Sequence, residues 1–281
     1  MTTRTDEGYL LDNQRSEAER RFDALSDLFD ATTFRHLEAV GVGPGWHCLE
    51  VGAGGPSVPA WLSDRVGPTG RVLATDIEPR WLAPLERPNV EVRRHEIGAD
   101  PLPPDTFDLI HLRLVLTHVV RRDDAVASMA AALRPGGWLV VEDFDTVLVT
   151  EASLDPTVVA TPVLNRVRAA FLDALAGRGV DLQFGRKLPR LLRRLGLVDV
   201  GADAYVTLAG RPAARRLERA NVEQVGPAMV AGGLLEQADL DRFFAVIDAE
   251  ELDVVLPALV SAWGRRPASD AGSGRADRRR R

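Results

Sequence analysis

The sequence has one cysteine, Cys48, and one lysine, Lys187, among its 281 residues. A single thiol cannot form an internal disulfide, so Cys48 is expected to pack in the core. Arginine supplies the other basic residues apart from the histidines, and alanine and glycine are frequent. This usage indicates a GC-rich bacterial genome, such as that of an actinomycete.

Long apolar runs are also missing. No stretch approaches the roughly 20 residues that a membrane-spanning helix needs. Residues 1–12 lack the basic-then-apolar pattern of a secretory signal. We therefore expect a soluble, cytoplasmic protein with no membrane partner.

Charge is unevenly distributed along the chain. The formal net charge is −6, although residues 265–281 hold seven arginines against Asp270 and Asp277. An acidic body is a poor match for a phosphate backbone, so we expect no nucleic-acid partner. Residues 268–281 offer no apolar anchor and are predicted to form a disordered tail, although a basic tail could also bind nucleic acid or an acidic partner.

The most informative motif is the segment Leu-Glu-Val-Gly-Ala-Gly-Gly-Pro-Ser at residues 49–57. It follows a short apolar run and precedes a helical pattern, and its glycines allow a sharp turn close to a ligand. Ser57 stands where a dinucleotide-binding loop has its third glycine, and the Gly-Lys-Ser/Thr of a P-loop is absent. An acid-x-Gly-x-Gly pattern remains, which a turn without a ligand would also explain.

Four more apolar runs follow at a regular rhythm. They cover residues 71–76, 90–97, 106–111 and 138–143, the last after a Pro-Gly-Gly turn. Asp76 ends the second run, where a carboxylate can accept both hydrogen bonds of a ribose diol. Helical patterns at 57–66, 114–120 and 123–133 alternate with these runs. The alternation predicts parallel strands joined by right-handed crossovers.

Taken in order, these motifs resemble the motif series of class I S-adenosylmethionine-dependent methyltransferases. Residues 17–145 resemble the ubiquinone/menaquinone-biosynthesis-like group, in which many bacterial members act in secondary metabolism. The resemblance implies an α/β fold with a Rossmann-like, seven-stranded, mostly parallel sheet. It also implies S-adenosylmethionine as cofactor, S-adenosylhomocysteine as product and a small molecule as methyl acceptor.

The resemblance assigns cofactor contacts residue by residue. The candidates are Glu50 at the amino end of the methionine, Gly52, Ala53 and Gly54 beneath the cofactor, Asp76 on the ribose hydroxyls, Ile77 on the adenine face, Glu96 and Ile97 at the adenine edge, and Leu112 and Arg113 on the methionine side. The family's third loop glycine is replaced by Pro56, which removes an N–H from the helix start. Cofactor binding is still expected, because Gly52 and Gly54 remain.

The outer parts of the predicted domain, residues 1–267, are expected to shape the cleft. Helices at 14–29 and 31–40 form an N-terminal cap (1–40), with Tyr9 and Arg20-Arg21-Phe22 as lid candidates, ahead of the cofactor-binding core (41–145). The acceptor-side half (146–267) holds helices at 157–176 and 187–195 and strands at 197–208 and 256–263. A helical insertion at 213–252, between the last two strands, is expected to form a wall of the acceptor pocket.

Methyl transfer is an in-line displacement that needs positioning and, for a hydroxyl acceptor, a base. The base candidates are His118 and Asp143; His36, His47 and His111 are expected to be structural. No cluster has metal-binding spacing, so no metal is expected. An oxygen acceptor is favoured over nitrogen or carbon, and the protein could be a homodimer. The alternatives are a cofactor-binding enzyme that does not methylate, such as a cyclase, and a non-catalytic binding protein.

Overall fold

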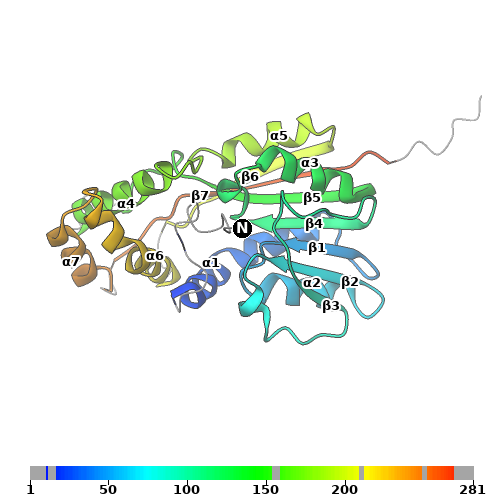
Figure 1. Ribbon diagram of the computed structural model, residues 1–281, viewed down its shortest axis with the longest axis horizontal. Helices are drawn as coiled ribbons and strands as arrows, with labels where there is room; N and C mark the ends of the chain where they lie inside the picture. The colour runs from blue at the N-terminus through cyan, green and yellow to red at the C-terminus, as the bar shows by residue number, and fades with distance from the viewer. Residues whose placement is uncertain (1–10, 12–16, 154–158, 209–211, 249–251, 269–281) are drawn as a thin grey trace, which may run out of the picture.

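The computed structural model describes residues 17–153, 159–208, 212–248 and 252–268, together with Leu11. Seven strands form one sheet in the order β3-β2-β1-β4-β5-β7-β6 (Figure 1). The strands are β1 His47–Val51, β2 Arg71–Asp76, β3 Val90–Arg94, β4 Phe107–Arg113, β5 Leu133–Asp145, β6 Val198–Tyr205 and β7 Ala258–Arg265. Strand β7 is antiparallel to β5 and β6, and the other neighbouring strands are parallel. The predicted seven-stranded, mostly parallel α/β fold is therefore confirmed.

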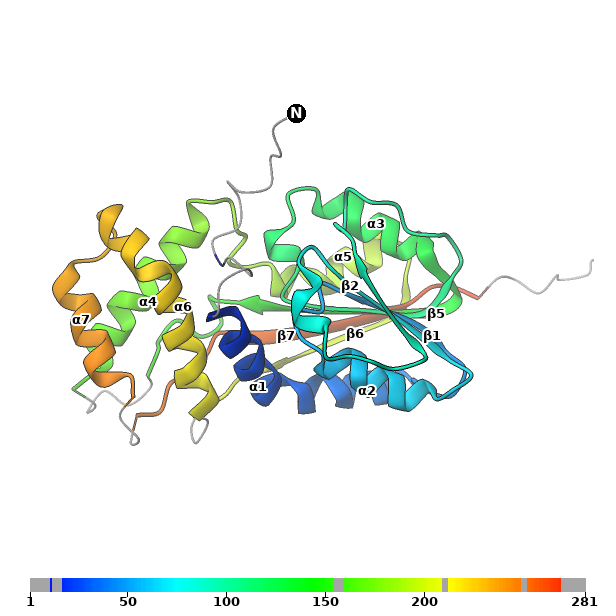
Figure 2. The same cartoon turned by 60° about the horizontal axis from the view of Figure 1, so that its bottom comes forward.

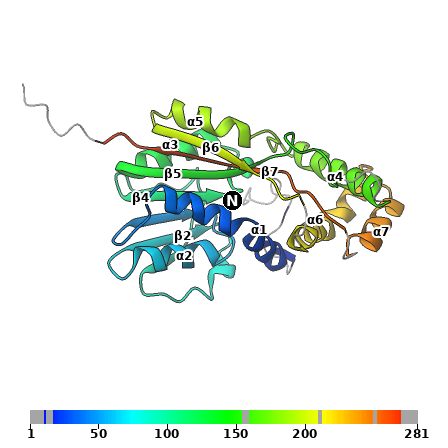
Figure 3. The ribbon, with the colours of Figure 1, turned by 180° about the vertical axis from the view of Figure 1, so that it is seen from behind.

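Helices cover both faces of the sheet. They are α1 Glu17–Ala39, α2 Ser57–Val66, α3 Arg122–Ala132, α4 Thr161–Ala176, α5 Leu188–Arg194, α6 Pro212–Ala231 and α7 Gln237–Val246, with 3₁₀ turns η1 Pro79–Leu82, η2 Leu116–His118 and η3 Gly185–Lys187. Figure 2 shows α1 and α2 on one face of the sheet and α3 and α5 on the other. In Figure 3, which views the molecule from the side opposite to Figure 1, α1 lies in front of the sheet. Alternating side chains serve the two layers: Cys48 packs with Leu37 and Leu62 on the α1 face, whereas Leu49 packs with Leu188 on the opposite face.

A third group of helices extends beyond the carboxyl ends of the parallel strands. Helices α4, α6 and α7 lie there, next to the first part of α1 (Figure 1). Their shared core includes Phe29, Leu164, Met229 and Phe243, all at most 2 % exposed. Helices α6 and α7 lie between β6 and β7 in the chain, which confirms the predicted helical insertion.

Several predicted boundaries were wrong. The two N-terminal helices are one continuous helix, α1, because its buried face passes through Phe29, Thr33 and Leu37 without a break. The helix predicted at 114–120 is only the 3₁₀ turn η2, and β3 ends at Arg94 rather than residue 97. The Pro-Gly-Gly turn falls within β5, where the register against β4 shifts between Phe107 and Leu109. Tyr9 and the predicted tail beyond residue 268 lie outside the described residues.

A row of polar side chains crosses the sheet beneath α1. Five neighbouring strands contribute, in sheet order, Glu50 of β1, His111 of β4, Glu142 of β5, Ser261 of β7 and Asp203 of β6. Nδ1 of His111 lies 2.6 Å from Oε2 of Glu50, and its Nε2 lies 3.5 Å from Oε2 of Glu142. Oγ of Ser261 donates to Oε1 of Glu142 at 2.7 Å. His111, Glu142 and Ser261 are fully buried.

Helix α1 binds to this row through side chains of its own. Thr33 donates a hydrogen bond to Glu142. His36 lies between Glu142, at 3.2 Å from Nδ1, and Asp203, at 3.0 Å from Nε2. Burying such groups is costly unless each has a partner, so the network fixes where α1 crosses the sheet.

The network also fixes the protonation of its members. Burial opposes a charge on His111, but the Glu50 and Glu142 carboxylates outweigh it and raise the pKa of His111 to about 9. Burial also opposes the charge on Glu142, yet the His111 ring 3.5 Å away and the hydrogen bond with His36 lower the pKa of Glu142. Burial raises the pKa of Glu50, and His111 opposes that rise. At neutral pH, we therefore expect His111 to be an imidazolium that pairs with Glu142 and Glu50.

This protonation predicts how stability depends on pH. Because the pKa of His111 rises from 6.5 to about 9 on folding, its contribution is complete below pH 6.5 and is lost as pH rises through 9. We expect the melting temperature of the native protein to fall between pH 6.5 and 9. The His111→Gln variant should be less stable at pH 6.5 and show a shallower fall across this window. Parallel pH profiles of the two proteins by thermal denaturation would contradict the assignment.

Among the described residues, no helix has both the length and the apolar character needed to cross a bilayer.

Candidate active site

The glycine-rich segment forms a tight loop between β1 and α2. Gly52 and Gly54 have φ angles of +61° and +63°, in the left-handed region that favours glycine. A Cβ atom on Gly54 would lie 2.6 Å from the Phe22 ring, and one on Gly52 would lie 2.5 Å from the Val115 side chain. The loop therefore needs glycine for its own packing against Phe22 of α1. Phe22 also lines the cleft, and its role as part of a lid stays a prediction.

The backbone donors of the loop are largely used within the protein. Ala53 N–H donates to the carbonyl of Thr75 at 2.9 Å, and Gly55 N–H donates to the carbonyl of Ala53 at 2.6 Å. Pro56, which has no N–H, precedes α2 in a helical conformation. An anion at this helix start would find few free donors, as the replacement of the third glycine by Pro56 predicted.

Asp76 ties the loop to the end of β2. Its Oδ2 accepts the Gly54 N–H at 2.9 Å, and its Oδ1 accepts the Glu78 N–H at 2.9 Å. Burial raises the pKa of Asp76, while these hydrogen bonds oppose the rise. Each carboxylate oxygen keeps acceptor capacity, because it has two lone pairs. The carboxylate can thus hold the loop and still accept hydroxyl donors from a ligand.

A cleft of about 1070 Å³ opens between the carboxyl ends of the strands and the helices α1, α4 and α6. Nine of the ten predicted cofactor residues and both predicted bases line it: Glu50, Gly52, Ala53, Gly54, Asp76, Ile77, Glu96, Ile97, Arg113, His118 and Asp143. Leu112 does not. It is 1 % exposed and packs in the core on the α3 face, because neighbouring residues of a strand point to opposite faces.

Arg113 and Arg21 bring positive charge to the cleft wall. Arg113 donates to Oγ1 of Thr33 and Oδ1 of Asp30, both at 3.0 Å, so it also fastens α1. Arg21 is 3 % exposed and donates to Oε1 of Gln224 on α6 at 2.8 Å. Both guanidiniums are held in place and lie where an anionic ligand group could bind.

The two predicted bases differ in their environments. Burial, with the nearby Arg21 and Arg122 cations, lowers the pKa of His118 to about 4. Burial raises the pKa of Asp143 to about 7, although it accepts N–H bonds from Thr117 at 3.2 Å and Phe144 at 2.9 Å. A base works best when its pKa lies near the working pH, so the structure favours Asp143 over His118.

Two polar residues of the cleft were missed in the sequence. His95 is 7 % exposed, and neither of its ring nitrogens has a hydrogen-bond partner among the described residues. The same holds for Oδ1 of Asn221 on α6. His95 could have been found from its position beside Glu96 at the end of an apolar run. The sequence around Asn221 gives no such signal, because this residue lies on a helix of the insertion. Within the described chain, no group of three His, Cys, Asp or Glu residues is arranged to hold a metal ion.

Comparisons with known proteins agree with this geometry. A family model described as a methyltransferase domain matches residues 49–141. The chain is 30% identical over 172 residues to methyltransferase str2 of Strobilurus tenacellus, covering 60% of this chain and 59% of that protein. It is 30% identical over 137 residues to the ubiquinone/menaquinone biosynthesis C-methyltransferase UbiE of Pseudomonas entomophila, covering 44% of this chain and 54% of that protein. The chain thus spans little more than half the length of these relatives.

Solved structures share the fold at low identity. Phosphoethanolamine N-methyltransferase 2 of Haemonchus contortus, solved with phosphomonomethylethanolamine and S-adenosylhomocysteine, aligns with a TM-score of 0.56 and 14% identity. The alignment covers 93% of this chain and 60% of that one. Together, the sheet order and the family-model match over residues 49–141 show an S-adenosylmethionine-dependent methyltransferase domain. In sequence, the chain is similar to the ubiquinone/menaquinone biosynthesis C-methyltransferases.

The contact between Phe22 and the loop leads to a stability prediction. The Gly54→Ala variant should lose on the order of 1–3 kcal/mol in the free energy of unfolding, because its Cβ meets the Phe22 ring and its φ is unfavourable. The matched control is Gly55→Ala, whose Cβ would lie 3.5 Å from Phe22 and whose φ is not in the left-handed region. Equal losses for the two variants in urea denaturation would rule out the contact.

Proposed function

We propose that this protein transfers the methyl group of S-adenosylmethionine to a hydroxyl of a small molecule in bacterial secondary metabolism. The observation that carries the proposal is the position of Asp143, a buried carboxyl at the wall of the cleft that accepts hydrogen bonds from Thr117 and Phe144. Burial raises its pKa to about 7. The hydroxyl oxygen attacks the methyl carbon, the carbon–sulfur bond breaks, and its electron pair stays on sulfur. Asp143 takes the hydroxyl proton.

In the proposed complex, the cofactor lies across the glycine loop. The Asp76 carboxylate accepts the ribose hydroxyls, and Ile77, Glu96 and Ile97 surround the adenine. Glu50 meets the amino group of the methionine. Arg21 and Arg113 supply the positive charge for its carboxylate, because the loop offers few free N–H donors.

The acceptor lies on the side of the cleft made by the helices. Phe171 of α4 and Leu217 and Asn221 of α6 line this side, which gives it an apolar wall with one polar group. A carbon acceptor is the second candidate, since the UbiE relative is named a C-methyltransferase. An acidic carbon would also need a base, so Asp143 could act with either an oxygen or a carbon acceptor. The two reactions differ in whether an oxygen–methyl or a carbon–methyl bond forms.

The direct test is incubation with methyl-labelled S-adenosylmethionine and a bacterial metabolite extract. Label in a new small molecule supports the proposal, and its position shows whether oxygen or carbon was methylated. Cofactor binding without label transfer would point to a reaction other than methylation. Absence of binding would contradict the proposal entirely.

The ribose contact predicts the effect of Asp76→Ala. Loss of the charge-assisted hydrogen bonds should weaken S-adenosylmethionine and S-adenosylhomocysteine together by about tenfold or more in calorimetry. The control is Asp64→Ala, an acid of α2 that does not line the cleft. Thermal melts would show whether Asp76→Ala still folds, since the side chain also holds the loop. A folded variant with unchanged affinities would refute the ribose contact.

The assignment of the base predicts a pH profile. The deprotonated Asp143 is the active form, so turnover should rise with pH and level off above about 7. The Asp143→Asn variant should lose about 10²–10⁴-fold in turnover and lose this rise, with cofactor affinity unchanged. His118→Gln should keep turnover within a few-fold, because a base of pKa about 4 is weak. The opposite pattern would transfer the role to His118.

A further inference from the structure

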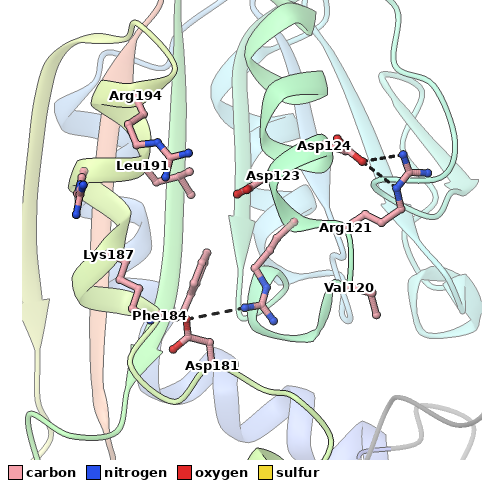
Figure 4. Close-up of a pocket in the computed structure, with 11 residues that line it drawn as sticks. Val120, Arg121, Asp123, Asp124, Asp181, Phe184, Lys187, Leu191 and Arg194 are labelled. Carbon is pink, nitrogen blue, oxygen red and sulfur yellow. Dashed lines mark hydrogen bonds and ion pairs between the residues drawn. The ribbon is translucent and has the colours of Figure 1, made fainter.

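A second cavity, of about 600 Å³, lies between α3 and α5 (Figure 4). Val120, Arg121 and Asp181 line both this cavity and the cleft, so the two are neighbours that share a rim. We call the second cavity the α3–α5 groove. None of the roles proposed above uses it.

The walls of the groove carry more cations than anions. Arg121 and Asp124 pair with each other at 2.7 Å on the side of α3 away from α5 (Figure 4). The remaining charged lining residues are four cations, Arg122, Lys187, Arg190 and Arg194, and two carboxylates, Asp123 and Asp181. The groove thus has a surplus of two positive charges in a chain whose formal net charge is −6.

The surplus belongs to α5. Asp181, which also lines the cleft, partly offsets two of the other cations, because it lies 2.5 Å from Nζ of Lys187 and 3.9 Å from Nη1 of Arg122. No carboxylate of the described chain lies within ion-pair distance of Arg190 or Arg194. Leu188 and Leu192 bury the inner side of α5 and leave these two arginines exposed, one helical turn apart. Side chains one turn apart are neighbours on a helix surface, so both guanidiniums can reach one multiply charged anion.

The floor of the groove is rigid. The guanidinium of Arg122 lies 5.4 Å from the centroid of the Phe184 ring and donates to the carbonyls of Val119 at 3.1 Å and Thr117 at 3.2 Å. Phe184 is 5 % exposed. Val120, 94 % exposed, offers an apolar contact at the rim between groove and cleft. A ligand in the groove therefore meets a fixed surface that continues toward the site of reaction.

We propose that the α3–α5 groove binds a phosphoryl group on an extension of the methyl acceptor. Arg190 and Arg194 hold the phosphoryl oxygens, the linking chain passes Val120, and the reacting hydroxyl lies in the cleft beside Asp143. This inference rests on the proposed function for the identity of the acceptor, but the anion site itself does not depend on methyl transfer.

The anion site is tested first, with inorganic pyrophosphate as the probe and the full chain in calorimetry at low salt. The native protein should bind pyrophosphate, and the double variant Arg190→Gln/Arg194→Gln should bind it at least tenfold more weakly. The matched control is Arg193→Gln, an exposed arginine of the same helix that does not line the groove. Saturating S-adenosylhomocysteine should leave pyrophosphate binding unchanged. No binding, equal binding by the double variant, or displacement by S-adenosylhomocysteine would each overturn the site.

The acceptor class is tested second, with label transfer into the low-molecular-mass fraction of a metabolite extract. Treating the extract with phosphatase, then removing the phosphatase, should abolish labelling, and the double variant should label the untreated extract at least tenfold less than Arg193→Gln does. If the phosphatase-treated extract is labelled as strongly as the untreated one, or if the double variant and Arg193→Gln label the untreated extract equally, the acceptor is not phosphorylated. Either result would still establish methyl transfer. If no molecule is labelled but the protein still binds pyrophosphate, both the acceptor assignment and the proposed function are overturned. The anion site would then still stand.

Discussion

The structure depends on one buried row of charges that runs across the sheet beneath α1. Glu142 is its centre, because it accepts from Thr33 and Ser261 and lies beside His111 and His36. Two carboxylates in a core would repel each other and lose their hydration. An imidazolium at His111, between Glu50 and Glu142, offsets both effects, and the raised pKa of His111 agrees with that charge.

This row links the stability of the fold to the geometry of the cleft. Glu50 lies near the end of β1 and lines the cleft. Its carboxylate, which is proposed to bind the cofactor, is held in place by the hydrogen bond with His111. The same row anchors α1, and α1 carries Phe22 onto the glycine loop and Arg21 into the cleft wall. Loss of the row would therefore displace the lid and the cofactor-side acid together.

The sequence predicted the elements that depend on local patterns and missed those that depend on contacts across the sheet. Buried strands and the loop glycines have strong local signals, so the sheet was predicted correctly and nine of the ten cofactor candidates line one cleft, where their contacts with the cofactor stay predictions. Leu112 was misplaced because the family likeness gives a position but not the face of the strand. His111 was expected to be structural, but its bond to Glu50 arises from strand pairing, which no single segment of sequence reveals. The α3–α5 groove joins segments about 60 residues apart, and its cations stand among many other arginines.

The most direct test of this account is the protonation state of His111 in the folded protein. Selective ¹⁵N labelling of histidine, with His111 assigned by comparison with the His111→Gln variant, would report both ring nitrogens by NMR. The account predicts that both carry protons at pH 7.5 and that the ring titrates near pH 9. A neutral ring at pH 7.5 would contradict it, because Glu50 and Glu142 would then lack the charge that holds them in the core.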